Sequence, residues 1–226
     1  MKDNRIQIAI DGPASSGKST IAKLLADKYH LVYVDTGAMY RTLTYLALKN
    51  NINIDKERDL TALLKEIKIT FKRKQDGQDV FANGEKITDK IRQHNVTNNV
   101  SIVSSFPKVR EELVRRQQAL AEQSDVVMDG RDIGTVVLPN ADVKIFLIAS
   151  VEERAERRYL ENQQKGIETD FSRLKEEIIA RDKYDSNRKE SPLKQAEDAI
   201  CVDTTGLSIS EVVNKCMELI NKKIKN

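Results

Sequence analysis

The chain has 226 residues, enough for one large domain or for one domain with a small insert. Its composition, 39% hydrophobic and 32% charged, is that of a soluble globular protein, and no apolar run approaches the ~20 residues that a membrane span needs. The chain has 38 basic and 35 acidic residues, and the resulting net charge of +3 is too small to favour nucleic acid as a partner.

The first predicted element is a strand at residues 6–10, and a phosphate-binding loop follows it. The spacing GxxxxGKS from Gly12 to Ser19 is that of a P-loop, and the apolar periodicity of residues 21–28 predicts a helix directly after it. In such a loop, glycines let successive N–H groups turn toward phosphate oxygens. Lys18 reaches the phosphates as a point charge, and the Ser19 hydroxyl can bind Mg²⁺.

The apolar pattern of the residues from 31 onward predicts a parallel sheet with an insert. Residues 31–35 form a second apolar run and residues 36–50 a helical pattern, so strand and helix alternate. From residue 52 the pattern changes, and residues 67–72 alternate between apolar and polar. The turn dipeptides Asp76-Gly77 and Asn83-Gly84 then predict a small antiparallel meander, which we interpret as an insert over the ligand edge of the sheet.

The second half of the chain predicts three more strands, at residues 125–129, 143–149 and 199–203, and a last helix at 209–220. Asp129 ends the first of these in a Walker-B-like arrangement, where it would help to hold Mg²⁺ or its waters. Another helix is predicted to start at Pro107, and its Arg110 falls outside the apolar spacing.

An arginine-rich stretch between residues 150 and 190 predicts a helical hairpin. Three arginines near its start share one helix side, and Arg181, Asp185 and Arg188 share one side of the second helix if it runs that far. The common interpretation of such a run is a solvated charged surface. Its base, however, lies at the sheet edge that carries the P-loop, so we interpret it as a lid that closes over phosphates.

The two cysteines and the amino terminus bear on localisation. Cys201 and Cys216 lack metal-ligand spacing, so we interpret both as packing residues and expect no disulfide scaffold. The residues before Ile6 lead directly into a strand, so we expect no signal peptide and a cytoplasmic protein.

Taken together, these motifs resemble the bacterial cytidylate kinases over essentially the whole chain. The strings that carry the resemblance are GPASSGKST (12–20), DTGAMYR (35–41), FPKVR (106–110), DGRDIGTVV (129–137) and ARDKYDSNR (180–188). The resemblance implies an α/β P-loop core with a five-stranded parallel sheet flanked by helices, a small antiparallel insert and a helical-hairpin lid. The implied boundaries are 1–51 and 96–226 for the core, 52–95 for the insert over the CMP site, and 150–190 for the lid.

The resemblance also implies the reaction ATP + CMP giving ADP + CDP, with dCMP also accepted, and it assigns roles to residues. The implied catalytic residues are Lys18, Arg131, Arg158 and Arg181. The implied ATP contacts are Gly12, Pro13, Ala14, Ser15, Ser16, Gly17, Lys18, Ser19, Thr20, Arg154, Arg157 and Arg158. The implied CMP contacts are Thr36, Arg41, Ser101, Arg110, Arg131, Asp132, Asp185 and Arg188. Ser19 and Asp129 would hold Mg²⁺, directly or through water.

Within the CMP contacts, the resemblance gives Ser101, Arg110 and Arg188 to cytosine, Arg41 and Arg131 to phosphate, and Asp185 to the sugar. Thr36 stands where some members of the family have Ser, and it keeps the hydroxyl. We expect a monomer that binds neither nucleic acid nor membrane.

Three alternatives stay open at this point. The nearest is another small-molecule P-loop kinase, acting on a different monophosphate, a sugar or a shikimate-like alcohol. A GTP-dependent switch protein would need an N-K-x-D motif, and the nearest string, Asn214-Lys215-Cys216-Met217, lacks the acidic residue. A nucleic-acid-binding module on the arginine hairpin lacks interleaved aromatic residues.

Overall fold

The computed structural model describes residues 5–74 and 77–224, which form two compact units. The first unit takes the chain up to Val32 and again from Ser124 onward, and the second spans Tyr33–Gln123. The expected insert, residues 52–95, lies within the second unit, and the expected lid, residues 150–190, within the first. The roles of these two segments stay predictions.

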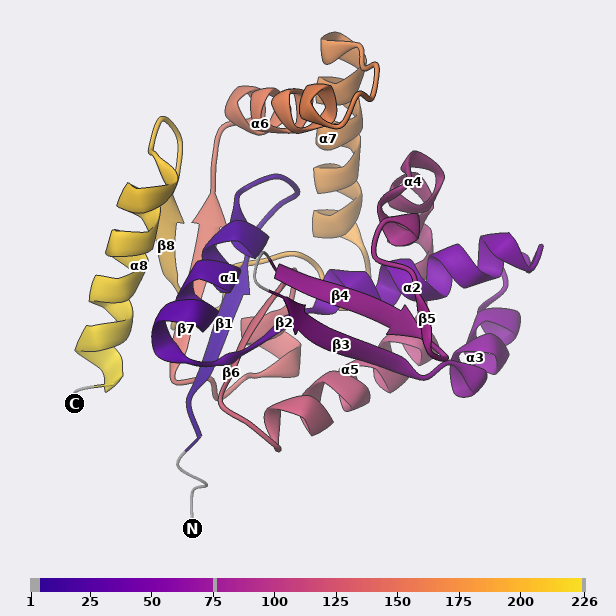
Figure 1. Cartoon of the computed structure of the whole chain (residues 1–226), viewed down its shortest axis with the longest axis horizontal. Coiled ribbons are helices and arrows are strands. Elements are labelled where there is room, and N and C mark those ends of the chain that lie inside the picture. Colours follow the sequence, from indigo (N-terminus) through magenta and orange to yellow (C-terminus); the bar gives the residue numbers. More distant parts are fainter. Residues whose placement is uncertain (1–4, 75–76, 225–226) are drawn as a thin grey trace. The chain divides into compact units, whose positions relative to one another are not determined.

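A five-stranded sheet with the order β2-β6-β1-β7-β8 forms the centre of the fold (Figure 1). The central strand β1 pairs in parallel with both β6 and β7, and β7 pairs in parallel with β8. The strands are β1 (Gln7–Asp11), β2 (Val32–Asp35), β6 (Val126–Gly130), β7 (Val143–Ile148) and β8 (Ile200–Asp203). This arrangement confirms the predicted parallel α/β fold.

Helices α1 (Lys18–Tyr29) and α8 (Ile209–Ile224) pack against each other and against the sheet of the first unit. α1 contacts β1 and β6, and α8 contacts β7. Because the strands are covered by helices, β6 is buried along its whole length, which explains its continuous apolar sequence. After β6 the chain makes a π-helical turn, η2 (Ile133–Val137), which contacts β1 and β6.

The predicted hairpin consists of α6 (Val151–Gln164) and α7 (Phe171–Asn187), which pack against each other (Figure 1). Ser150 caps α6 by accepting the Glu153 N–H, and Asp170 caps α7 by accepting the Arg173 N–H. The buried apolar core of the hairpin is small, with Ala155, Leu174 and Ile178 at its centre. α7 ends at Asn187, so Arg188 lies just beyond the helix that carries Arg181 and Asp185.

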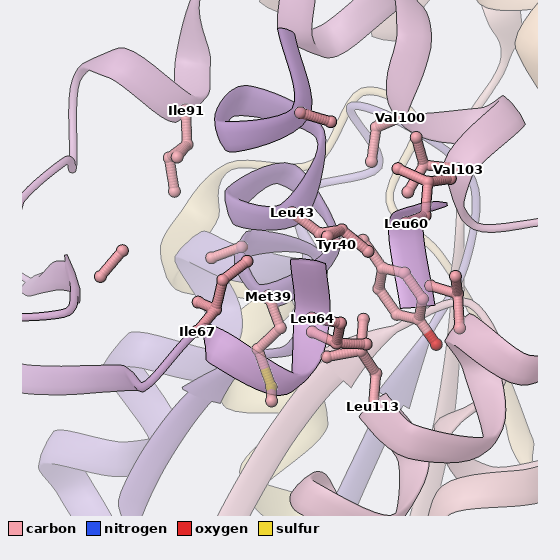
Figure 2. Close-up of a cluster of buried hydrophobic side chains, with 14 of the residues drawn as sticks. Met39, Tyr40, Leu43, Leu60, Leu64, Ile67, Ile91, Val100, Val103 and Leu113 are labelled. Atoms are coloured by element: carbon pink, nitrogen blue, oxygen red, sulfur yellow. The ribbon is translucent and has the colours of Figure 1, made fainter. Parts of the chain in front are cut away.

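The second unit surrounds a cluster of buried hydrophobic side chains, shown in Figure 2. Its helices are α2 (Thr36–Lys49), α3 (Glu57–Glu66), α4 (His94–Val103) and α5 (Pro107–Ala121), with a 3₁₀ turn, η1 (Lys90–Arg92). Leu43 of α2, Leu60 and Leu64 of α3, and Leu113 of α5 are fully buried in this cluster. All four helices therefore share one core.

The predicted meander is a three-stranded antiparallel sheet with the order β3-β4-β5. Its strands are β3 (Ile69–Lys74), β4 (Gly77–Ala82) and β5 (Glu85–Lys86). The Asn83-Gly84 turn joins β4 to β5 as predicted, with both residues at positive φ. Asp76 of the other predicted turn lies outside the described residues.

One sequence interpretation was wrong. Cys201 lies in β8 but is exposed, so only Cys216 is a packing residue, and burial raises the pKa of its thiol to about 12. Arg110 is buried on the inner side of α5 together with Val109 and Leu113, although it breaks the apolar spacing. None of the helices in the described part of the chain combines the length and the apolar composition that a bilayer crossing requires.

Candidate active site

The predicted phosphate-binding loop lies between β1 and α1, at the carboxyl end of the central strand. A side chain at Gly12 could not be accommodated, because its Cβ would lie 2.0 Å from the Leu147 carbonyl oxygen of β7. Gly17 precedes α1 with a φ of 90°, a left-handed conformation that glycine adopts without strain. The first N–H groups of α1 have no side-chain cap, which is the arrangement that binds an anion at a helix start.

Lys18 is buried at the start of α1. Its Nζ donates to the Pro13 carbonyl oxygen at 2.6 Å, within the loop itself. Burial lowers the pKa of Lys18 well below its usual value, and the positive charges of Arg131 and Arg181 lower it further. The structure therefore brings together three of the four predicted catalytic cations. Arg158, the fourth, lies on α6 and pairs with Glu161 at 3.2 Å.

The two predicted metal ligands meet at the edge between α1 and β6. The Ser19 hydroxyl donates to a carboxylate oxygen of Asp129 over 2.8 Å. A serine hydroxyl and a carboxylate are oxygen ligands of the kind that Mg²⁺ prefers, so the residues present fit this ion.

The turn after β6 contacts the end of α7 through two ion pairs. Arg131 donates from Nε to Asp185 at 2.9 Å, and Arg188 lies 3.7 Å from Asp132. Burial alone would raise the pKa of Asp185, but the positive charges around it, chiefly Arg131, hold it below the usual range. Four of the predicted CMP contacts thus form two neighbouring ion pairs, in which the carboxylates of Asp132 and Asp185 are buried.

The arginines of the predicted lid each have partners in the first unit. Arg154 is buried and donates to the carbonyl oxygens of Ala149 and Ala14, at 3.0 and 3.1 Å, the latter within the phosphate loop. It also pairs with Asp182 of α7 at 2.6 Å. Arg157 donates to the hydroxyl and the carbonyl oxygen of Thr204, in the loop after β8. The base of the hairpin is therefore tied to two loops at the carboxyl edge of the sheet.

The remaining predicted CMP contacts belong to the second unit. Thr36 is buried at the start of α2, where Asp35 caps the helix by accepting the Ala38 N–H. Arg41, nearly two turns along, donates from one nitrogen to both oxygens of Asp35 at 3.1 and 2.8 Å. Asp35 also lies 3.6 Å from Arg92, so it is the shared partner of two cations.

Ser101 and Arg110 come from consecutive helices and are linked through Ser104. The Arg110 guanidinium is buried, donates to the Ser104 carbonyl oxygen at 3.1 Å and lies 5.4 Å from the centre of the Tyr40 ring. The Ser104 hydroxyl in turn donates to the Ser101 carbonyl oxygen at 3.1 Å. This set holds a guanidinium in a fixed orientation beside an aromatic ring.

Sequence reasoning missed several residues that hold the site. Asp182 pairs with Arg154, Asp35 pairs with Arg41, and Tyr40 lies against Arg110. Asp11 and Asp35 each end a parallel strand of the central sheet, and that position was a signal available in the sequence. Asp182 falls within the family string at residues 180–188, but the string does not show which cation its carboxylate contacts.

The parallel sheet, the glycine-rich loop before α1 and the cations around Lys18 define a kinase of the P-loop class. Two solved structures cover nearly the whole chain with a TM-score of 0.51, which supports the fold. One is a gluconokinase from Sinorhizobium meliloti, 14% identical, matched over 98% of this chain and 94% of its own. The other is an uncharacterized protein from Eubacterium ventriosum, 13% identical, matched over 96% and 99%.

Within this class, the chain belongs to the cytidylate kinase family, whose model matches residues 8–222. A cytidylate kinase of Bacillus cytotoxicus is 58% identical over 223 residues, which is 99% of both chains. A cytidylate kinase of Bacillus cereus is 58% identical over 219 residues, or 97% of both. The family resemblance of the sequence is thereby confirmed.

Proposed function

We propose that this chain transfers the γ-phosphoryl group of ATP to CMP and dCMP, giving ADP and CDP or dCDP. One observation carries the proposal. Lys18 lies at a helix start beside the positive charges of Arg131 and Arg181, which are close enough to lower its pKa. The three positive side chains repel one another at the start of the helix. A phosphoryl group carries negative charge on its oxygens, and its attraction to all three offsets that repulsion.

ATP binds with its phosphates on the loop residues 12–20. The N–H groups of the loop and of the first turn of α1 bind phosphate oxygens, and Lys18 moves from the Pro13 carbonyl oxygen to the β- and γ-phosphates. Ser19 and Asp129 hold Mg²⁺, directly or through water, and the ion supplies charge neutralisation and orientation of the phosphates. Arg154, Arg157 and Arg158 of the lid contact the nucleotide from α6.

The residues of the chain position the two substrates and neutralise the charge of their phosphates, and none of these residues acts as a strong base. The attacking group is a phosphate oxygen of CMP, which is already negatively charged and has no proton to lose when it is ionised. Arg131 orients this phosphate, and Arg181 meets the transferred phosphoryl group. Asp185 pairs with Arg131 and so holds its guanidinium in place.

We assign the acceptor contacts residue by residue from the family resemblance. Arg41 and Arg131 bind its phosphate, Asp185 its sugar, and Ser101, Arg110 and Arg188 its base, while Thr36 and Asp132 complete the contacts. Cytosine accepts a hydrogen bond at N3 and donates from its 4-amino group, whereas uracil does the reverse. Arg110 has only donors, so it faces N3 or the 2-carbonyl oxygen, and the Ser101 hydroxyl or Asp132 accepts from the amine.

The finer parts of the proposal follow the resemblance of the sequence to the family. The insert at 52–95 covers the CMP site, and the hairpin at 150–190 closes over ATP. The chain works as a monomer in the cytoplasm, in pyrimidine nucleotide metabolism, without a nucleic-acid or membrane partner.

A coupled ADP-release assay over a panel of monophosphates tests the proposal. The expected order is CMP and dCMP far above UMP, with AMP lowest, because a mismatched base leaves buried polar groups unpaired at ~1–3 kcal/mol each. Arg110→Met should reduce kcat/KM for CMP and narrow its lead over UMP. Arg115→Met is the matched control, since Arg115 lies on the same helix and is largely exposed. Equal turnover of CMP and UMP by the unmodified enzyme would refute the proposal.

A further inference from the structure

Asp11 ends the central strand β1, and its carboxylate is almost completely buried. One carboxylate oxygen accepts the Ile133 N–H and the other accepts the Gly134 N–H, each at 2.7 Å. These N–H groups open the π-helical turn η2, which follows Arg131 and Asp132 directly. Because both oxygens are used, the side chain fixes two successive peptide groups of the turn.

The Lys144 side chain of β7 lies beside the same turn. A Cβ on Gly134 would lie 3.1 Å from the Lys144 Cδ and 3.4 Å from an Asp11 oxygen, so both side chains contact this glycine closely. The Lys144 ammonium donates to the Pro139 carbonyl oxygen at 2.6 Å and pairs with Asp198. The turn is therefore enclosed by side chains from two neighbouring parallel strands.

Keeping a charge at Asp11 is unfavourable for the fold. Burial raises the pKa of its carboxyl to about 6, although the two N–H groups lower it, and the negative charge of Asp132 raises it further. An asparagine of the same size would avoid that burial of charge, but its amide could accept only one of the two N–H groups properly. The doubly accepting carboxylate thus contributes geometry to the turn more than stability to the fold.

We propose that Asp11 is a positioning residue for the phosphoryl acceptor, which holds the Ile133–Gly134 turn so that Arg131 and Asp132 meet CMP in a fixed orientation. This inference rests on the proposed function, because it needs these two residues to contact the acceptor. Asp11 itself touches no substrate. Its effect therefore belongs to the acceptor side of the reaction and not to ATP.

The first test is Asp11→Asn, with steady-state kinetics for each substrate. We expect kcat/KM for CMP to fall about tenfold or more, the effect of one charge-assisted hydrogen bond, and KM for ATP to stay within about threefold. Asp142→Asn is the control, because Asp142 also accepts a β1 backbone N–H, that of Gln7, at the opposite end of the strand. The control should leave both constants unchanged.

A pH series separates positioning from a general structural role. When Asp11 of the unmodified protein is protonated, it resembles the Asn variant, so the ratio of their kcat/KM values for CMP should fall toward one from about pH 8 to about pH 5. The ratio cancels the ionisation of CMP itself. The ratio also cancels the titration of the charged groups on the elements around Asp11, because both proteins contain them. These groups are Lys18 of α1, Asp129 of β6, Asp132 before the turn and Lys144 of β7.

Gly134→Ala provides a second, independent perturbation if the Asn variant does not fold. Its Cβ would displace the turn from Asp11 and Lys144, so the same selective loss for CMP is expected. Equal losses for ATP and CMP, or a pH-independent ratio, would overturn the proposal. Absence of CMP phosphorylation by the unmodified protein would instead refute the proposed function, so the two failures are distinguishable.

Discussion

Removing the charge of Asp182 should loosen the α6–α7 hairpin more than any exposed substitution on it. Asp182 pairs with Arg154 at 2.6 Å, and the two side chains are 22% and 4% exposed. Asp182→Asn leaves the Arg154 guanidinium buried with its carbonyl contacts but without a counter-charge. Breaking a fully buried pair from one side costs about 3–5 kcal/mol. Because Asp182 is one-fifth exposed, we expect a smaller loss of about 2–3 kcal/mol.

This loss should be local, because the hairpin has a small core of its own. Three residues, Ala155, Leu174 and Ile178, form its buried centre, so few other contacts oppose its opening. Hydrogen exchange followed by mass spectrometry measures the opening directly. Amides of α6 and α7 should exchange about 30-fold to 150-fold faster in Asp182→Asn, which is the expected loss of about 2–3 kcal/mol expressed as a ratio of opening constants. Amides of β1 should stay protected.

A double-mutant cycle identifies the pair as the cause. Arg154→Met removes the buried charge together with its need for a partner, so the double variant should be less destabilised than the sum of the two single ones. Arg173→Met is the matched control, since Arg173 pairs with Glu177 on the surface of α7 and is 75% exposed. Additive effects, or equal exchange of the hairpin in Asp182→Asn and in the control, would refute the reasoning.

Three further predictions follow from the site. Lys18→Ala should abolish phosphoryl transfer while circular dichroism shows a native fold, and retained activity would exclude a role for the P-loop. Arg181→Ala should lower kcat by about 10³-fold with little change in CMP binding; a raised KM alone would place this arginine in the acceptor site. Between its ordinary pKa of 3.8 and its folded value of about 6, Asp11 binds more protons folded than unfolded. The protein should therefore lose up to about 3 kcal/mol relative to Asp11→Asn as pH rises from 4 to 6, and urea unfolding that shows no such difference would contradict the buried charge.

The order of the elements was predictable because the relevant signals are local. The GxxxxGKS spacing, the apolar runs and the Asn83-Gly84 turn each involve a few neighbouring residues, and the structure confirms all of them. Arg110 was harder, because its position breaks the apolar spacing of α5. It is buried nonetheless, since Tyr40 and the Ser104 carbonyl oxygen provide the contacts that a guanidinium needs. Those partners come from α2 and from the end of α4, and sequence spacing cannot relate them.

The anionic partners of the site were unpredictable for the same reason, and they change the view of binding. The sequence marks Lys18 and the arginines as phosphate ligands, but it does not show that Arg131 is held by Asp185, Arg154 by Asp182 and Arg41 by Asp35. Where a cation already has a partner, a phosphate must displace a carboxylate or share the cation with it. The net gain from each contact is then much smaller than the bare attraction, because one charged hydrogen bond replaces another. In the first unit, where Arg131 and Arg154 are both paired, we therefore predict that a ligand gains most when it contacts both cations at once.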